Sequence, residues 1–229
     1  MIGRLGRTLS FYGDLQRLVH EILVKACRIQ KATRILEIGC GSGSVLSRLT
    51  EFSNSVYGID VSYSAVKMSR KMVTGVSVAD AGLLPFADCS FDLVYSTGVV
   101  DLFGDEDAAA ILKEVARVTC SGGSIVAVTA WKGCILHEAV KRYLIGKSRW
   151  RYGPKRTFGS LAPLLPVSIE SIRERRMGAI FQFRFISYLF EEYAPVRIFY
   201  HSLFLVLSIL LWPLNRLPGA LLVTMLEKK

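Results

Sequence analysis

Apolar positions along the chain follow two spacings, one typical of buried strands and one typical of helices. The segments 34–37 and 55–60 are short strand-like runs, each ending in an acidic residue. Residues 78–100 have the pattern of strand, loop and strand. A helical spacing follows and leads through Gly122-Gly123 into a fifth strand. The apolar positions of that helix are Ile111, Leu112, Val115 and Val118. This alternation predicts an α/β fold with a parallel sheet.

The N-terminal part of the chain predicts an amphipathic helix. Its apolar face is formed by Leu15, Leu18, Val19, Ile22, Leu23 and Ala26. Before it, residues 1–16 hold no continuous apolar core of the kind found in a signal peptide.

The C-terminal third mixes helix and strand patterns. We expect a helix near 160–165 and a strand near 180–185, in a region interrupted by prolines. Residues 198–215 are uncharged and apolar around the whole helix, so this insert must be buried against protein or lipid. The last ten residues, 220–229, have the pattern of a strand.

The most informative motif is RILEIGCGSG at residues 34–43. A strand breaks into a glycine-rich turn, with Gly39, Gly41 and Gly43 at alternate positions before a helix. A dinucleotide-binding fingerprint needs Gly at the first, third and sixth positions, whereas Ser44 is sixth here. An NAD-dependent oxidoreductase is therefore the least favoured function. The pattern E-x-G-x-G-x-G instead resembles the first motif of class I S-adenosylmethionine-dependent methyltransferases.

Later segments continue this resemblance in the order and at the intervals of the family. The second strand ends in Asp60, in the place where an acid accepts hydrogen bonds from both ribose hydroxyls of a cofactor. The resemblance places Asp80 at the adenine amino group, with Ala81 beside it. We also count Val61 and Thr97 among the cofactor-binding residues.

The resemblance implies a fold, a cofactor and a domain layout. The fold is an α/β, Rossmann-like seven-stranded sheet, mostly parallel with the last strand antiparallel, and helices on both faces. With 229 residues, 51% of them hydrophobic, the chain can bury one full core. We expect a single methyltransferase domain that binds S-adenosyl-L-methionine. Its parts are an N-terminal helical cap (1–33), a cofactor-binding core (34–130) and an acceptor-side region (131–229).

The chemistry of the glycine loop follows from its backbone. N–H groups around 39–43 and the N-terminus of the next helix can receive the methionyl carboxylate, because a helix end carries unsatisfied donors and partial positive charge. Glu37 can then hold the ammonium group, directly or through water. Cys40 lies inside the loop and is interpreted as a small filler that packs under the cofactor.

The acceptor chemistry is less specific. Methyltransferases acting on amino groups commonly carry an Asn or Asp, two prolines and an aromatic after the fourth strand, whereas 96–100 here read STGVV. This favours an oxygen or carbon acceptor. Methyl transfer depends mainly on in-line positioning, and a general base is needed when the acceptor is not already ionised. Asp101 and His137 are the candidate catalytic residues, with a turn cap and a surface helix position as the structural alternatives.

The excess of positive over negative charge lies entirely in the C-terminal part. The net charge is +10; residues 1–140 hold fourteen basic and fourteen acidic side chains, and residues 141–229 hold fifteen and five. The densest basic stretch is 141–156, with Tyr143, Trp150 and Tyr152 interleaved. It is interpreted as a surface for lipid headgroups or a substrate phosphate. A solvated loop is the alternative, and stacking of RNA bases on the aromatics is another.

The basic stretch 141–156 and the apolar insert 198–215 together suggest a peripheral membrane contact. A helix lying on the membrane suits the insert better than a span, because 220–229 must return to the same sheet. Burial in a dimer or against the sheet is the alternative, and the oligomeric state is left open. The hypothesis is a methyltransferase acting at O or C of a hydrophobic small molecule or lipid-linked acceptor. An RNA methyltransferase and a non-catalytic cofactor-binding subunit are the alternatives.

The cysteines indicate neither a metal site nor redox chemistry. They are Cys27, Cys40, Cys89, Cys120 and Cys134, an odd number with no C-x-x-C pair. We therefore expect no metal, reduced thiols and a cytoplasmic protein, peripheral on the membrane if the insert contacts lipid.

Overall fold

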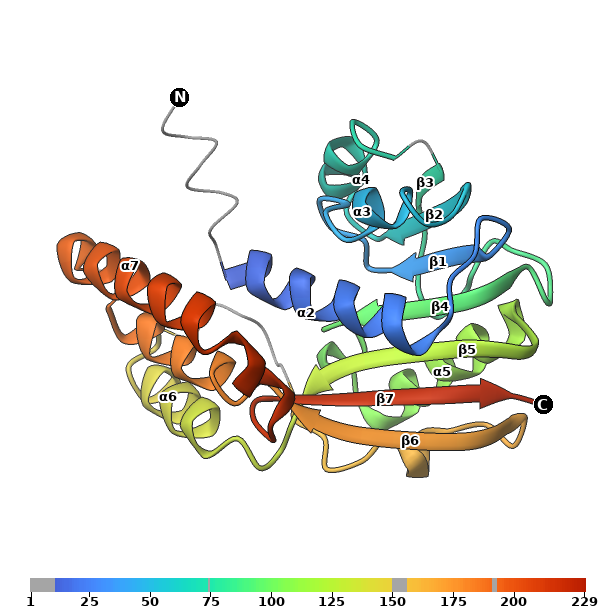
Figure 1. The fold of residues 1–229 in the computed structure, drawn as a ribbon. Helices are drawn as coiled ribbons and strands as arrows, with labels where there is room; N and C mark the ends of the chain where they lie inside the picture. Colours follow the sequence, from blue (N-terminus) through green and yellow to red (C-terminus); the bar gives the residue numbers. More distant parts are fainter. Residues whose placement is uncertain (1–10, 74, 150–155, 191–192) are drawn as a thin grey trace.

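The fold is that of a computed structural model, which describes residues 11–73, 75–149, 156–190 and 193–229 (Figure 1). Within these residues seven strands form one sheet in the order β3-β2-β1-β4-β5-β7-β6. The strands are β1 (Arg34–Ile38), β2 (Ser55–Asp60), β3 (Gly75–Val78), β4 (Phe91–Thr97), β5 (Thr119–Ala130), β6 (Ile169–Met177) and β7 (Leu221–Lys228).

The sheet is parallel from β3 to β5 and changes direction at β7. The last strand pairs antiparallel with β5 on one side and with β6 on the other. Since β6 is antiparallel to β7, it runs in the same direction as β1 to β5. The predicted Rossmann-like, mostly parallel sheet with an antiparallel last strand is confirmed.

Helices cover both faces of the sheet. The α-helices are α2 (Phe11–Ala26), α3 (Leu46–Leu49), α4 (Tyr63–Ser69), α5 (Asp105–Val118), α6 (Ile135–Gly146) and α7 (Ala194–Leu210). The 3-10 helices are η1 (Val100–Leu102), η2 (Ala162–Leu164), η3 (Phe181–Phe190) and η4 (Trp212–Arg216). Leu18 and Leu23 of α2 are buried with Ile35 in one core cluster, while Ile111 of α5 is buried with Leu36 in the other. Successive strand residues point to opposite faces, so neighbours in β1 enter different clusters.

Two expectations for the C-terminal third are wrong. The strand expected near 180–185 lies at 169–177, and residues 181–190 form η3 instead. The reason is that β6 is an edge strand with the sequence IESIRERRM, and charged residues suit an edge whose backbone groups face solvent. The helix expected near 160–165 is limited to the short turn η2, whose second residue is Pro163.

A helical layer lies beyond the carboxyl ends of the parallel strands. Figure 1 shows α6, η3 and α7 side by side there, with η3 in contact with both other helices. The apolar insert predicted at 198–215 forms most of α7, which begins four residues earlier, and then η4. In the part of the chain that the structure describes, no helix is both long and apolar enough to cross a membrane.

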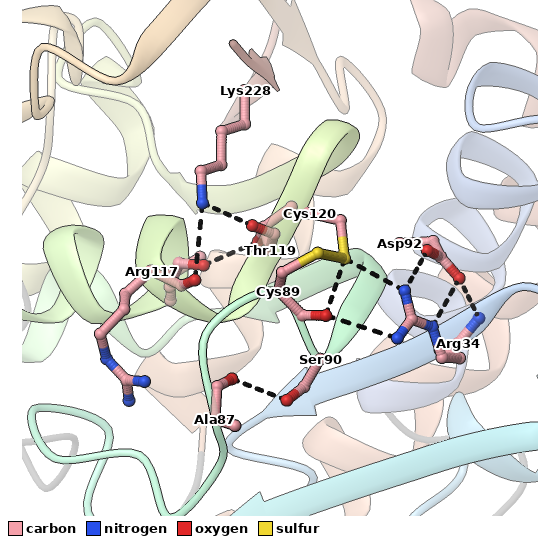
Figure 2. The surroundings of a disulfide bond; sticks show 10 residues. Arg34, Ala87, Cys89, Ser90, Asp92, Arg117, Thr119, Cys120 and Lys228 are labelled. Carbon is pink, nitrogen blue, oxygen red and sulfur yellow. Dashed lines mark hydrogen bonds and ion pairs between the residues drawn. A yellow bond between two sulfur atoms is a disulfide. The ribbon is translucent and has the colours of Figure 1, made fainter.

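The expectation of reduced thiols is wrong for two cysteines. Cys89, before β4, and Cys120, in β5, form a disulfide with a Cα–Cα distance of 4.0 Å (Figure 2). Arg34 at the start of β1 lies beside it, where it pairs with Asp92 at 2.7 Å and donates to the Cys120 sulfur at 3.1 Å. The disulfide therefore ties together the amino ends of the strands, opposite the end where the glycine loop lies. Cys27, Cys40 and Cys134 are free.

Candidate functional site

The glycine loop between β1 and α3 has a left-handed backbone at each of its three glycines. The φ angles of Gly39, Gly41 and Gly43 are 73°, 53° and 76°. A Cβ on Gly39 would collide with the Val99 side chain, and one on Gly43 would collide with Ser69. A Cβ on Gly41 would meet nothing within 4 Å. Close packing therefore requires glycine at 39 and 43, whereas Gly41 faces open space of the kind that a ligand requires.

Cys40 packs as a filler, as the sequence indicated. Its side chain is 5% exposed and lies against strand β2, where a Cβ on Gly58 would meet the Cys40 Cβ at 2.9 Å. Burial raises the pKa of the Cys40 thiol to about 12, and the neighbouring Glu37 adds to this. A thiol in this environment stays protonated and has little nucleophilic character.

Glu37 is a buried carboxyl group at the centre of the site. Burial raises its pKa to about 8; the Tyr95 hydroxyl beside it opposes this shift, and the charge of Asp60 adds to it. Its Oε2 atom is buried without a hydrogen-bond partner among the described residues. A buried carboxylate oxygen needs a donor or a cation, so Glu37 fits the predicted contact with an ammonium group.

Asp60, at the end of β2, organises the loop. Its two carboxylate oxygens accept hydrogen bonds from Gly41 N at 2.9 Å and from Ser62 N at 2.8 Å. Each oxygen keeps a further lone pair that can accept a bond from a ribose hydroxyl. The side chain is partly exposed, so a ligand can reach it.

The expected adenine side of the site is open. Asp80 is exposed, and its Oδ1 accepts a hydrogen bond from Gly82 N at 2.7 Å, which leaves the other oxygen available. Val61 is 77% exposed and Leu83 is 78% exposed, while Ala81 is partly buried. Exposed apolar side chains beside a carboxylate suit a planar, polar-edged ring such as adenine.

The acceptor-side candidates are both buried. Asp101 lies in η1, directly after β4, and is 2% exposed. His137 lies in α6 and is 3% exposed, with its Nδ1 at 3.7 Å from a Glu138 carboxylate oxygen. The surface position considered for His137 is therefore wrong. Thr97, at the end of β4, has a hydroxyl that is buried without a hydrogen-bond partner among the described residues.

Only part of the basic stretch 141–156 is described. Arg156 is held in the fold by an ion pair with Asp105 at 2.8 Å, and its backbone N–H donates to the Asp101 carbonyl at 2.7 Å. Trp150 and Tyr152, considered for RNA stacking, lie outside the described residues. No group of three or more His, Cys, Asp or Glu that could hold a metal occurs among the described residues.

Sequence reasoning missed Tyr95 and Val99. Tyr95 lies opposite Glu37 in the register of β1 and β4, and burial together with Glu37 raises its pKa well above the usual value. Aligning the two strands on their apolar residues would have placed these side chains together. Val99 packs over Gly39, a contact that no local pattern indicates.

The residues at this edge fit S-adenosylmethionine. The buried Glu37 Oε2 and the lone pairs of Asp60 match an ammonium group and a ribose. The buried Thr97 hydroxyl is a further polar atom that lacks a partner among the described residues.

Comparisons with known proteins agree with this assignment. Residues 36–127 match the family described as "Methyltransferase domain". The malonyl-[acyl-carrier protein] O-methyltransferase of Erwinia pyrifoliae is 30% identical over 161 residues, covering 69% of this chain and 59% of that protein. The probable tRNA methyltransferase 9B of Bos taurus is 31% identical over 123 residues, covering 52% of this chain and 26% of that protein. The chain therefore spans less than two thirds of these relatives.

A solved structure shows the same fold over the whole chain. The Thermotoga maritima protein described as an S-adenosylmethionine-dependent methyltransferase, possibly a histamine N-methyltransferase, has a TM-score of 0.62 at 17% identity. The match covers 100% of this chain and 96% of that one. The motifs and the sheet order agree with the family match, and residues 36–127 form a class I S-adenosylmethionine-dependent methyltransferase domain, with S-adenosylmethionine as its cofactor.

Proposed function

We propose that the protein transfers a methyl group to an oxygen or carbon atom of a hydrophobic acceptor, either a small molecule or a lipid-linked one. The observation that carries this proposal is the helical layer of α6, η3 and α7, which lies beyond the carboxyl ends of the strands and is rich in apolar residues. Ligands of open α/β sheets bind at these strand ends, so an acceptor would meet the layer.

Two further observations support an oxygen acceptor. The segment 96–100 lacks the Asn or Asp and the prolines typical of amino-group methylation. Several curated relatives are named malonyl-[acyl-carrier protein] O-methyltransferases, which the names describe as acting at oxygen of an acyl group.

Each cofactor-facing residue has a distinct role in the proposed site. The loop 39–43 would bind the methionyl carboxylate, Glu37 the ammonium group and Asp60 the ribose hydroxyls. Asp80, Ala81 and Val61 would contact the adenine. When bound, S-adenosylmethionine supplies an electrophilic methyl group on a sulfonium, and the chain's contribution is to hold the acceptor atom in line with it.

Asp101 and His137 are the proposed groups for accepting the acceptor's proton. Both follow carboxyl ends of central strands, and both are shielded from water. Because neither is exposed, the acceptor would have to enter the layer to reach them. An acceptor that is already ionised, such as a carboxylate, needs neither residue.

Transfer of labelled methyl from S-adenosylmethionine into a whole-cell extract tests the proposal. The products are separated into organic-soluble, nucleic-acid and aqueous fractions. Label in the organic fraction that is lost with Asp60→Asn supports the proposal. The asparagine keeps one acceptor oxygen for the loop but removes the charge, and thermal unfolding of the variant checks that it folds.

RNA methylation is the second candidate, because a relative named as a probable tRNA methyltransferase matches 52% of this chain and the stretch 141–156 is basic. Label in the nucleic-acid fraction would favour it over the hydrophobic acceptor. Cofactor binding without label in any fraction would favour a non-catalytic subunit.

A further inference from the structure

Helix α7 exposes a continuous apolar stripe along one side. Phe199 is 69% exposed, Val206 54% and Leu210 70%. With Val196, Leu203 and Leu207 these residues form what we call the α7 stripe, and all six are at least 40% exposed. At 100° per residue their side chains fall within an arc of about 100°. These six side chains therefore share one side of the helix, while Ile198, which is 62% exposed, projects from another side.

The flank of α7 next to the stripe packs against the rest of the protein. Phe204 is 5% exposed. The neighbouring Tyr200 donates a hydrogen bond from its hydroxyl to the Phe183 carbonyl of η3, with an O–O distance of 2.5 Å. The Tyr200 ring also contacts Phe190 of η3, with a centroid distance of 6.2 Å. Phe204 lies about 110° around the helix from the centre of the stripe, so packing on this flank leaves the stripe exposed.

The apolar surface continues beyond the helix. Leu211, Leu214 and Leu217 follow in and around η4 and are 38%, 40% and 52% exposed. Together with the stripe they expose on the order of 800 Å² of apolar area, whereas the largest apolar patch of a typical monomer is about 300–600 Å². A surface of this size requires an apolar partner.

The charges around the stripe distinguish between possible partners. Residues 198–215 contain no Asp, Glu, Lys or Arg. Helices that pair in water through an apolar seam usually flank it with charged residues that set register and orientation, and α7 carries none after Arg197. A lipid bilayer needs no such flanking charges. The lack of charge therefore favours a lipid partner over a second helix.

The same layer carries exposed positive charge. Arg142 and Lys147 at α6 are exposed, as is Arg216 at the end of η4. The acidic residue of the described layer is Glu138, which is partly buried, and Glu191 and Glu192 lie outside the described residues. Arg216 lies in sequence between the exposed Leu214 and Leu217, and an apolar surface with such a cation at its end is complementary to a bilayer that contains anionic lipids.

We propose that the α7 stripe docks the protein on the surface of an anionic lipid bilayer, with α7 lying in the plane of the interface. At 1.5 Å per residue its 17 residues extend about 25 Å, enough to lie along the surface. This inference rests on the proposed function and deepens it, because the helical layer that would meet a hydrophobic acceptor would then face lipid. Docking itself does not depend on methyl transfer.

Vesicle flotation tests the proposal with the full chain. Wild-type protein is mixed with vesicles of phosphatidylcholine alone or of phosphatidylcholine with phosphatidylglycerol, and the floated fraction is measured. We expect flotation with the anionic vesicles, weaker flotation with the neutral ones, and at least a tenfold loss for Leu210→Asp. The matched control is Val167→Asp, because Val167 is an aliphatic residue that is 95% exposed and lies outside the layer. It should float like the wild type.

Three results would overturn the proposal: no flotation of the wild type with either vesicle, equal flotation of Leu210→Asp, or equal loss in the Val167→Asp control. Light scattering without lipid tests whether the partner is instead a second copy of the chain. A wild-type dimer that Leu210→Asp converts to a monomer would show that a second copy of the chain covers the stripe. Flotation without methyl transfer would refute only the proposed function, whereas transfer to a detergent-dispersed acceptor without flotation would refute only the docking.

Discussion

The substitution Glu37→Gln tests the proposed role of the buried carboxyl group. In the folded protein its pKa is raised from 4.5 to about 8, chiefly by burial. Between these values the folded state binds more protons than the unfolded state, so stability falls as the pH rises. At pH 7, which is about 2.5 units above the unfolded pKa, Glu37 is ionised in the unfolded chain and must take up a proton on folding. At 1.36 kcal/mol per pH unit this costs about 3 kcal/mol of stability.

Glutamine fills almost the same volume and does not titrate. The variant should therefore match the wild type near pH 4.5 and become more stable by about 3 kcal/mol at pH 7. Urea unfolding at pH 5, 6 and 7 measures the difference in the free energy of unfolding. Glu51→Gln is the control, since Glu51 is exposed. A difference between Glu37→Gln and wild type that does not change with pH would refute the assignment of the raised pKa.

The same substitution should weaken cofactor binding. The glutamine amide oxygen can accept a hydrogen bond from an ammonium group but carries no negative charge, and loss of a charged hydrogen bond costs about 1.5–3 kcal/mol, or about tenfold or more in affinity. Titration calorimetry with S-adenosylhomocysteine measures this. Greater stability combined with weaker binding is the expected signature; unchanged affinity would show that Glu37 does not contact the ligand.

The remaining predictions concern the glycine loop and the disulfide. Gly41→Ala should cost about 1 kcal/mol from its positive φ yet weaken S-adenosylhomocysteine binding strongly, whereas Gly39→Ala should lower the thermal midpoint much more, because its Cβ would collide with Val99. Thermal scans and calorimetry on both variants compare them; a Gly39→Ala midpoint equal to that of Gly41→Ala would contradict the packing. Cys120→Ser should lose about 3 kcal/mol of stability in urea unfolding without reductant, since the loop closed with Cys89 spans 31 residues. The loss should vanish under reduction, and a variant as stable as wild type without reductant would mean that the two thiols are not joined.

The sequence was sufficient where local spacing determines the structure. The glycines at 39, 41 and 43 and the acid at 60 are recognisable because a turn and a strand end impose their own residue types. The amphipathic faces of α2 and α5 were recognisable for the same reason.

The sequence was insufficient where partners lie far apart along the chain. The Cys89–Cys120 disulfide depends on the pairing of β4 with β5, and the closeness of Tyr95 to Glu37 depends on the register of β1 with β4. The strand β6 was misplaced because its charges reflect an edge position. The apolar 181–190 segment resembles a strand until its packing against α6 and α7 is known.

The register between β6 and β7 makes η3, α7 and η4 a single insertion between two paired strands. Met177 and Leu221 are cross-strand partners, so residues 178–220 leave the sheet and return to it at one pair of neighbouring positions. The two ends of this insertion lie close together. Gly178 N donates a hydrogen bond to the Asn215 carbonyl at 2.7 Å, and a Cβ on Gly219 would collide with Gly178. In topological terms the two strands are a β-hairpin whose turn has grown into η3, α7 and η4. Such an architecture allows the surface that meets a partner to be exchanged or redesigned while the strands that build the glycine-loop end of the sheet keep their pairing.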